Sequence, residues 1–199
     1  MIDIQNMNSK DPYLEFKKRY ENALDCSQEN IQSAVISSWN NNLNEVNSRI
    51  VNIKYIIDDE WVFFSNYNSP KSDEFTTHNQ IAINFFWDRT NTQIRLKAYI
   101  KKTSEDLSDT HFLSRSKEKN ALAISSNQSK AISSYDAIKD NYHKELSRND
   151  NLLLRPKYWG GFSFTPYYFE FWRGHEFRLN KRIEYKLTQH KWLQSILQP

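Results

Sequence analysis

Short apolar and alternating runs dominate the middle of the chain, and such runs predict β-strands. The clearest runs occupy residues 49–57, 61–67, 80–87 and 92–102. The same pattern predicts further strands over residues 33–39, 161–173, 176–187 and 191–197. Many short strands with few helices favour a mainly β fold, a β-barrel with helices packed outside it.

Helical spacing appears before and after the central strands. Residues 12–25 place aromatic and apolar side chains at helical intervals, so they predict an amphipathic helix that Asp11 caps and Pro12 begins. Residues 69–78 predict a short helix, and residues 104–147 a helical stretch capped by Ser104.

The remaining segments are polar. Residues 40–48 are expected to form a loop, and residues 1–10 a disordered arm. No internal repeat and no low-complexity linker interrupts the chain, so residues 11–199 are expected to form a single domain.

The composition excludes several classes of protein. Three Gly are too few for a glycine-rich phosphate loop, and a single Cys excludes intrachain disulfides and thiolate zinc sites. The five His are scattered, so no metal site is expected. A net charge of +3 from many charges of both signs is not the pattern of a nucleic-acid-binding protein.

The chain shows no signal for a membrane or for secretion. No run of about 18 apolar residues occurs, and the N-terminus lacks the basic and apolar regions of a signal peptide. We therefore expect a cytoplasmic protein, and the single Cys26 suits a reducing compartment.

Residues 155–185 carry the strongest local pattern, which combines a proline, a double glycine, an aromatic run and a basic cluster. A buried hairpin with a Gly-Gly bulge and a solvated basic end explains most of it. It does not explain Arg178 and Arg182, four residues apart on one predicted strand. Arginines on one face beside aromatic side chains suit a planar or anionic ligand.

This segment resembles the C-terminal signature of the pyridoxamine 5′-phosphate oxidases, with Pro-x-x-Trp-Gly-Gly, Glu-Phe-Trp-x-Gly and Arg-Leu-x-x-Arg in order. The resemblance runs from Asp11 to Pro199. Its other elements are Arg49-x-Val-x-x-Lys54, Phe64-Ser65-Asn66-Tyr67 followed by Ser69 and Lys71, Gln93-Ile94-Arg95, and Ser126-Asn127-Gln128-Ser129. Each element alone is weak, but their order and spacing together are specific.

The resemblance implies a split β-barrel homodimer that binds FMN between its subunits, with a C-terminal dimerisation region at about 155–199. The family's FMN contacts correspond to Arg49, Ile50, Val51, Asn52, Ile53, Lys54, Phe64, Ser65, Lys71, Gln93, Gln128, Ser129, Trp172 and Arg182. Arg, Lys, amide and hydroxyl donors suit a flavin phosphate. Taken singly, Lys54 and Lys71 could instead be solvated lysines, and Gln128-Ser129 an ordinary cap or loop. Pro70 departs from the family, which usually has a basic residue there.

The resemblance also implies a site for a small phosphorylated pyridine substrate. Lys54 and Arg115 match the family's phosphate-binding positions, whereas His111 replaces a Tyr and Lys119 a Ser. An exposed helix face that binds nothing is the alternative for these two departures.

The residues expected over the substrate ring depart as well. The family's Arg-Leu-His motif reads Arg178-Leu179-Asn180 here, and Lys181 follows where an acidic residue is usual. Arg178 and Asn180 are the candidate catalytic residues. Asn180 cannot exchange a proton near neutral pH as His would.

The activity that the resemblance implies is oxidation of pyridoxamine or pyridoxine 5′-phosphate to pyridoxal 5′-phosphate, with dioxygen as the acceptor and hydrogen peroxide as a product. Two alternatives remain open. One is an oxidase of the same fold with another substrate, such as a dihydro-aromatic acid of the phenazine-biosynthesis type. The other is a flavin- or pyridoxal-phosphate-binding protein without turnover.

Overall fold

The structure is a computed structural model that describes residues 1–148 and 152–199. The strands in these residues are β1 Asp3–Gln5, β2 Ser33–Asn40, β3 Glu45–Asn52, β4 Tyr55–Ile57, β5 Glu60–Asn66, β6 Gln80–Trp87, β7 Thr92–Lys102, β8 Trp159–Arg173, β9 Lys181–Thr188 and β10 Lys191–Leu197. The helices are α1 Asp11–Asp25, α2 Pro70–Thr77, the short 3-10 helix η1 Asp88–Thr90, α3 Glu105–Ser114, α4 Lys117–Ser125 and α5 Tyr135–Arg148.

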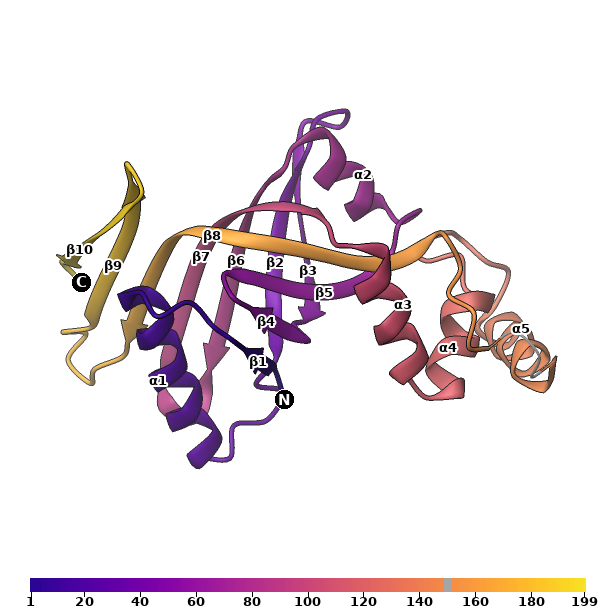
Figure 1. Cartoon of the computed structure of the whole chain (residues 1–199), viewed down its shortest axis with the longest axis horizontal. Coiled ribbons are helices and arrows are strands. Elements are labelled where there is room, and N and C mark those ends of the chain that lie inside the picture. Colours follow the sequence, from indigo (N-terminus) through magenta and orange to yellow (C-terminus); the bar gives the residue numbers. More distant parts are fainter. Residues whose placement is uncertain (149–151) are drawn as a thin grey trace.

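The strands form one mixed sheet in the order β1-β4-β5-β8-β7-β6-β2-β3, and β9 adds to β8 with β10 beside it. All pairings are antiparallel except that of β1 with β4. Figure 1 shows β8 running along the molecule, with the helices α3, α4 and α5 at one end and the β9–β10 hairpin at the other. No helix of the described residues has the length and apolar character needed to cross a membrane.

β8 joins the two ends of the molecule because its partners change along its length. Its first part pairs with β5, its last part pairs with β9, and β7 pairs with it from Phe162 to Arg173. The register between β7 and β8 shifts at Lys97 and Ala98, opposite Tyr168 and Pro166. Proline has no N–H for a ladder bond, which suits it to such an irregularity.

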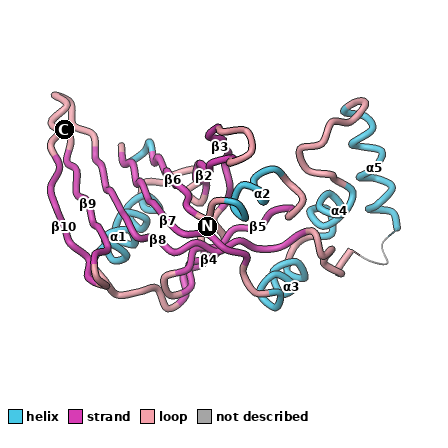
Figure 2. The backbone as a smooth tube through the Cα atoms, turned by 90° about the horizontal axis from the view of Figure 1, so that it is seen from above, coloured by secondary structure: helices cyan, strands magenta, loops and turns pink. Residues whose placement is uncertain are grey.

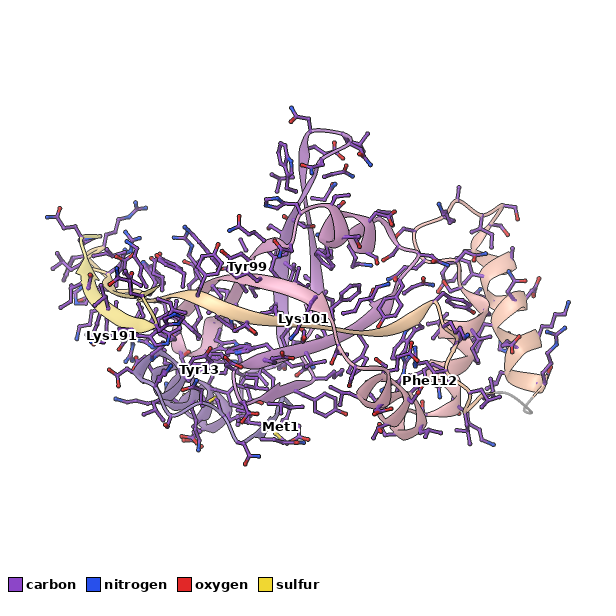
Figure 3. The ribbon with its side chains drawn as sticks, turned by 45° about the horizontal axis from the view of Figure 1, so that its top comes forward. Met1, Tyr13, Tyr99, Lys101, Phe112 and Lys191 are labelled. Carbon is purple, nitrogen blue, oxygen red and sulfur yellow. The ribbon has the colours of Figure 1, made fainter. Side chains whose placement is uncertain are left out.

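The core is largely aromatic, and α1 contributes several of its buried residues. Figure 2 shows α1 lying against the strands of the sheet. Phe16 is fully buried, and its ring centroid lies 4.4 Å from that of Trp61 and 5.8 Å from that of Trp87. Tyr13, labelled in Figure 3, packs edge-on against Phe169 of β8. Because α1 covers the open side of the sheet, the predicted amphipathic helix is confirmed, although Lys10 and not Asp11 is its N-cap residue.

The expectation that residues 1–10 are a disordered arm is wrong. Asp3–Gln5 pair in parallel with Tyr55–Ile57, and Ile2 is buried in the core. The Ile2 amide also donates a 2.8 Å hydrogen bond to the Tyr20 hydroxyl. Two alternating apolar residues, Ile2 and Ile4, were too short a signal to separate a strand from a loop.

Several predicted boundaries also differ. Residues 40–48 are not a loop, because β2 and β3 continue through them to a tight turn in which Asn40 Oδ1 accepts from the amides of Asn42 and Leu43. The predicted strand 49–57 divides into β3 and β4. The helical stretch 104–147 breaks into three helices, since the Ser116 side chain caps α4 and a loop precedes α5.

Gly160 and Gly161 do not form a bulge, because both lie in regular pairing with β5. Their lack of a side chain serves close packing. A Cβ on Gly160 would lie 2.2 Å from the Tyr67 hydroxyl oxygen, and one on Gly161 would lie 2.2 Å from Thr103 Cγ2.

Candidate functional site

A groove of about 530 Å³ lies where β3, β4 and β5 meet the helical end of the molecule. Its lining residues are Ile50, Val51, Asn52, Lys54, Phe64, Ser65, Lys71, His111, Ser114, Arg115, Ser116, Lys119, Gln128 and Trp159. The lining contains four Lys or Arg side chains and no carboxylate, which favours an anionic ligand.

Lys71 forms one end of the groove, in the first turn of α2. It is only 8% exposed, and its Nζ donates to Ser69 Oγ at 2.9 Å and to Ser65 Oγ at 3.1 Å. Gln128 reaches the same place from the loop after α4, where its Oε1 accepts from Ser65 Oγ at 3.2 Å. Residues far apart in the sequence therefore converge at this end.

The surroundings of Lys71 disfavour its positive charge. Burial, and then the nearby Arg49 guanidinium, lower the pKa of Lys71 from 10.5 to about 8. Both its hydrogen bonds go to neutral hydroxyls, and no ion pair of Lys71 occurs among the described residues. A buried cation without a partnered anion is costly, so this end is suited to a negatively charged group.

Arg49 lies beside the groove but does not line it. Its NH2 donates to Glu74 Oε2 at 2.7 Å and its NH1 donates to Ser38 Oγ at 2.5 Å. The Glu74 side chain is 1% exposed and also accepts from Ser38 and Asn47. Burial raises the pKa of Glu74, but the hydrogen bonds from Ser38 and Arg49 hold it below its usual value.

The other end of the groove is cationic as well. Lys54 follows β3, whereas Arg115 and Lys119 come from the junction of α3 and α4. The Arg115 guanidinium stacks over the Trp159 ring at 4.3 Å and donates to the Lys119 carbonyl at 2.8 Å. Burial, Lys119 and Arg115 together lower the pKa of Lys54. Mutual repulsion of these cations is relieved by an anion.

Three parallel rings form one wall between the two ends. His111 stacks on Phe64 with centroids 3.8 Å apart and planes 11° apart, and Trp159 lies 5.5 Å from Phe64 at 10°. Burial, followed by the charges of Arg115, Lys54 and Lys119, lowers the pKa of His111 to about 4. His111 is therefore neutral near pH 7. A wall of parallel rings suits a planar ligand.

The remaining predicted site residues do not line this groove. Ile53 is fully buried in the core, and Ser129 lines a neighbouring hollow with Ser126 and Lys130. Gln93, Trp172 and Arg182 are adjacent to one another across β7, β8 and β9. Arg182 Nε also donates to Glu170 Oε1 at 2.9 Å, and its NH2 forms an ion pair with the same oxygen at 2.8 Å.

The prediction that Arg178 and Arg182 share a strand face is wrong. β9 begins at Lys181, and Arg178 lies in the preceding turn with a left-handed φ of 58°. Asn180 Oδ1 accepts from the His175 amide at 3.1 Å and so closes this turn. The pattern predicted a strand from residue 176, but the hydrogen bonds of His175, Arg178 and Asn180 are made within the turn.

Sequence reasoning missed Glu74, Tyr55 and the groove role of Trp159. Glu74 holds Arg49 through a contact between α2 and β3, and Tyr55 hydrogen-bonds His111 across 56 positions of the chain. The sequence signal for the contact between Glu74 and Arg49 was only the presence of an acidic residue three positions after Lys71. Among the described residues, no group of three or more His, Cys, Asp or Glu side chains is placed to hold a metal ion.

The chain matches two family models. The one described as "Pyridoxamine 5'-phosphate oxidase" covers residues 21–148, and the one described as "Pyridoxine 5'-phosphate oxidase C-terminal dimerisation region" covers residues 159–199. The second match supports a homodimer.

Curated relatives agree with these matches. The pyridoxine/pyridoxamine 5′-phosphate oxidase 1 of Hydrogenovibrio crunogenus is 32% identical over 88% of this chain and 81% of its own length. The pyridoxine/pyridoxamine 5′-phosphate oxidase of Nostoc sp. is 33% identical over 91% of this chain and 85% of its own length. Both relatives are named as oxidases, which supports an oxidoreductase.

The fold agrees as well. A crystal structure of PhzG from Burkholderia lata, in complex with tetrahydrophenazine-1-carboxylic acid, has a TM-score of 0.89 at 22% identity, over 95% of this chain and 93% of that one. This likeness confirms the expected split barrel. With family models matching 21–148 and 159–199, the chain belongs to the pyridoxamine 5′-phosphate oxidase family.

Proposed function

We propose that this chain is an FMN-dependent oxidase that converts pyridoxamine or pyridoxine 5′-phosphate into pyridoxal 5′-phosphate, with dioxygen as the electron acceptor. The observation that carries the proposal is the groove, which has cations at both ends, a wall of parallel rings between them and no lining carboxylate. Two cationic ends suit two phosphates, one of a cofactor and one of a substrate.

The Lys71 end fits the phosphate of FMN. Lys71 offers a buried ammonium without a counter-ion, and Ser65 and Gln128 add a hydroxyl and an amide within hydrogen-bond reach of one another. When bound, FMN would supply the two-electron acceptor that takes a hydride from the carbon bearing the amine or hydroxyl. The role of the protein is then to bind, orient and desolvate the two ligands.

Two features limit the number of donors at this phosphate site. Pro70 supplies no donor where the family usually has a basic residue, and Glu74 already engages Arg49. Each charged hydrogen bond that is lost corresponds to about 1.5–3 kcal/mol. We therefore expect FMN to bind through Lys71 chiefly, and more weakly than with a second free cation.

The opposite end fits the substrate phosphate. Lys54, Arg115 and Lys119 supply positive charge, and the stacking of Arg115 on Trp159 fixes the plane of its donors. His111 is neutral there, so it contributes a hydrogen bond and no charge.

We infer that the expected ligand contacts on β7, on β8 and in the turn after β8 act on the groove of a second chain. Trp159 lines the groove, and Trp172 lies thirteen positions later on the same strand, which is roughly 40 Å away. No mononucleotide spans that distance, so one chain cannot apply both residues to one cofactor. We infer that Gln93, Trp172, Arg178, Asn180 and Arg182 of one subunit face the groove of the other.

Arg178 and Asn180 have different roles in this proposal: Arg178 contacts the ligand, and Asn180 holds the turn that carries Arg178. Arg178 lies exposed at the tip of the turn after β8, where its guanidinium is free to meet an anionic or planar ligand. Asn180 uses its carbonyl oxygen to close that turn, so it positions Arg178 and exchanges no proton.

A second candidate is an oxidase of the same fold that acts on a dihydro-aromatic acid. The departures His111, Lys119, Asn180 and Lys181 favour it, because they alter the substrate end and leave the Lys71 end in place. Cations bind a carboxylate as readily as a phosphate, so the groove alone does not separate the two substrates.

The absorbance spectrum of the purified protein tests the proposal. We expect a flavin spectrum that bleaches when pyridoxamine 5′-phosphate is added without oxygen, with peroxide released when air returns. Bleaching only by a dihydro-aromatic acid would establish the second candidate. A flavin spectrum that neither compound bleaches would indicate a binding protein without turnover, and a colourless protein that takes up no FMN would refute both oxidases.

Two variants separate cofactor binding from turnover. Lys71→Ala should weaken FMN retention, whereas Arg178→Ala should leave FMN bound and lower turnover strongly. Lys17→Ala, on the exposed face of α1, is the matched control and should change neither.

A further inference from the structure

Tyr55 contacts His111 from outside the groove. Its hydroxyl oxygen lies 2.7 Å from His111 Nδ1, and the two rings are nearly perpendicular at 88°. Tyr55 is half-buried and is not a lining residue of the groove. A ligand in the groove therefore meets His111 and not Tyr55.

The His111 ring is held from two directions. Phe64 stacks on its face at 3.8 Å, and Tyr55 holds its Nδ1 edge while packing edge-on against Phe64 at 6.0 Å. Nε2 is then the only ring nitrogen left for a ligand, and no described residue forms a hydrogen bond with it. The ring plane and the direction of Nε2 are thus fixed before any ligand binds.

The charges around His111 make its tautomer important. Burial, and then the cations Arg115, Lys54 and Lys119, favour the neutral ring, which carries a single N–H. If that proton were on Nδ1, Nε2 would present a lone pair to an anion and repel it. If the proton is on Nε2, the ring donates to the anion. The hydrogen bond made by one ring nitrogen decides which nitrogen is protonated.

The Tyr55 hydroxyl is placed to determine which ring nitrogen of His111 carries the proton. Burial, and then the carboxylate of Asp3, raise the pKa of its phenol, and a hydrogen bond with the Ser114 side chain opposes them. The net shift is upward, so the phenol keeps its proton near neutral pH and can donate it to Nδ1. Its position is set by β4, which lies between β1 and β5 and pairs Tyr55 with Asp3 on one side and Val62 on the other. The N-terminal strand therefore supports the residue that holds His111.

We propose that Tyr55 is a positioning residue whose hydroxyl donates to His111 Nδ1 and so holds Nε2–H toward the groove as a neutral donor to the phosphate of the ligand. The proposal rests on the proposed function, in which this end of the groove binds the substrate phosphate. On this proposal, binding of the phosphate at this end depends on the direction of the hydrogen bond from His111 as well as on positive charge.

Tyr55→Phe removes only the hydroxyl and keeps the ring packing, so it is the informative variant. The first measurement is the tautomer of His111 in ligand-free protein, from long-range nitrogen–proton NMR correlations. We expect the Nε2–H tautomer in the natural protein and a mixture of tautomers in Tyr55→Phe. An Nδ1–H tautomer in the natural protein would overturn the proposal.

The second measurement is the dissociation constant of pyridoxal 5′-phosphate for the FMN-loaded protein. Because one neutral hydrogen bond corresponds to about 0.5–1.5 kcal/mol, we expect Tyr55→Phe to weaken binding about 2–12-fold while FMN affinity is unchanged. In a His111→Phe background the same change should have no further effect, since the donor is gone. An equal, additive loss in that background would show that Tyr55 acts on the fold and not through His111.

The two proposals fail separately. Absence of pyridoxal 5′-phosphate binding to the natural protein would contradict the proposed function. The tautomer measurement would still decide the role of Tyr55, and inorganic phosphate would serve as the probe of the anion-binding end. Phosphate binding that Tyr55→Phe leaves unchanged would overturn the role of Tyr55.

Discussion

Replacing Lys71 with Met should stabilise the FMN-free protein while weakening its hold on FMN. The fold lowers the pKa of Lys71 from 10.5 to about 8, chiefly by burial. Each pH unit of that difference corresponds to about 1.4 kcal/mol, so carrying the charge costs the folded protein about 3 kcal/mol at pH 7. Lys71→Met removes this cost and keeps the buried aliphatic stem.

Little else is lost in the variant. Ser69 Oγ still donates to the Asn66 carbonyl at 2.7 Å, and Ser65 Oγ still donates to Gln128 Oε1. Both hydroxyls that accept from Lys71 therefore keep a partner. We expect Lys71→Met to raise the free energy of unfolding of the FMN-free protein by about 2–3 kcal/mol at pH 7. The matching loss of a charged hydrogen bond to phosphate should weaken FMN binding about 10–150-fold.

The pH dependence gives the sharper test. Because the unfolded chain binds a proton at Lys71 up to about pH 10.5 and the folded chain only up to about 8, the stability of the natural protein rises between these values. The gap to Lys71→Met should therefore be full below pH 8 and close as pH approaches 10.5.

Urea unfolding of FMN-free protein at pH 7 and pH 10 measures this gap. Lys17→Met, at an exposed position of α1, should change stability by less than about 0.5 kcal/mol. Equal stability of Lys71→Met and natural protein at pH 7, or a gap that does not change with pH, would refute the reasoning.

Three further predictions concern the frame of the site. Gly161→Ala should lower stability by about 1–3 kcal/mol in chemical denaturation, because its Cβ meets Thr103 Cγ2, and Thr103→Ser, which lacks that methyl, should recover part of the loss. Glu170→Gln should lower the free energy of unfolding by about 2–3 kcal/mol in the same assay, because the buried carboxylate binds Arg182, Arg95 and Tyr168 on three strands. An unchanged free energy of unfolding would show that these contacts do not stabilise the fold. Glu74→Gln should lower stability at pH 7 by about 1.5–3 kcal/mol. Because the fold lowers the pKa of Glu74, that difference should be present above pH 4.5 and disappear at lower pH, and a difference that persists in strong acid would contradict this.

The chain pattern predicted most strands and the first helix because their side chains alternate or recur with the period of the element. The runs at 80–87 and 92–102 match β6 and β7 residue for residue. Boundaries failed where hydrogen bonds between distant segments set them. Asp3–Gln5 form a strand only because Tyr55–Ile57 lie beside them, and no local period reports that pairing.

Part of the candidate site, too, was predicted from the sequence, and part was decided only by the fold. The motifs named Lys71, Ser65, Gln128, Lys54 and Arg115 as ligand-binding residues, and the fold brings all five to one groove. The sequence could not separate residues that line the groove from those that share a motif with them. Ile53 and Lys54 are neighbours in the link between β3 and β4, yet Lys54 lines the groove and Ile53 is buried in the core.

The sequence by itself determined the barrel class, the family and the chemical types of the site residues, since these depend on local pattern and on motif order. Only the tertiary structure decided that Glu74 engages Arg49, that Tyr55 holds His111, and that Trp172 and Arg182 lie far from the groove of their own chain. The physical reason is that charge pairing, burial and ring orientation depend on distances between segments. Those distances are fixed by strand register and helix packing.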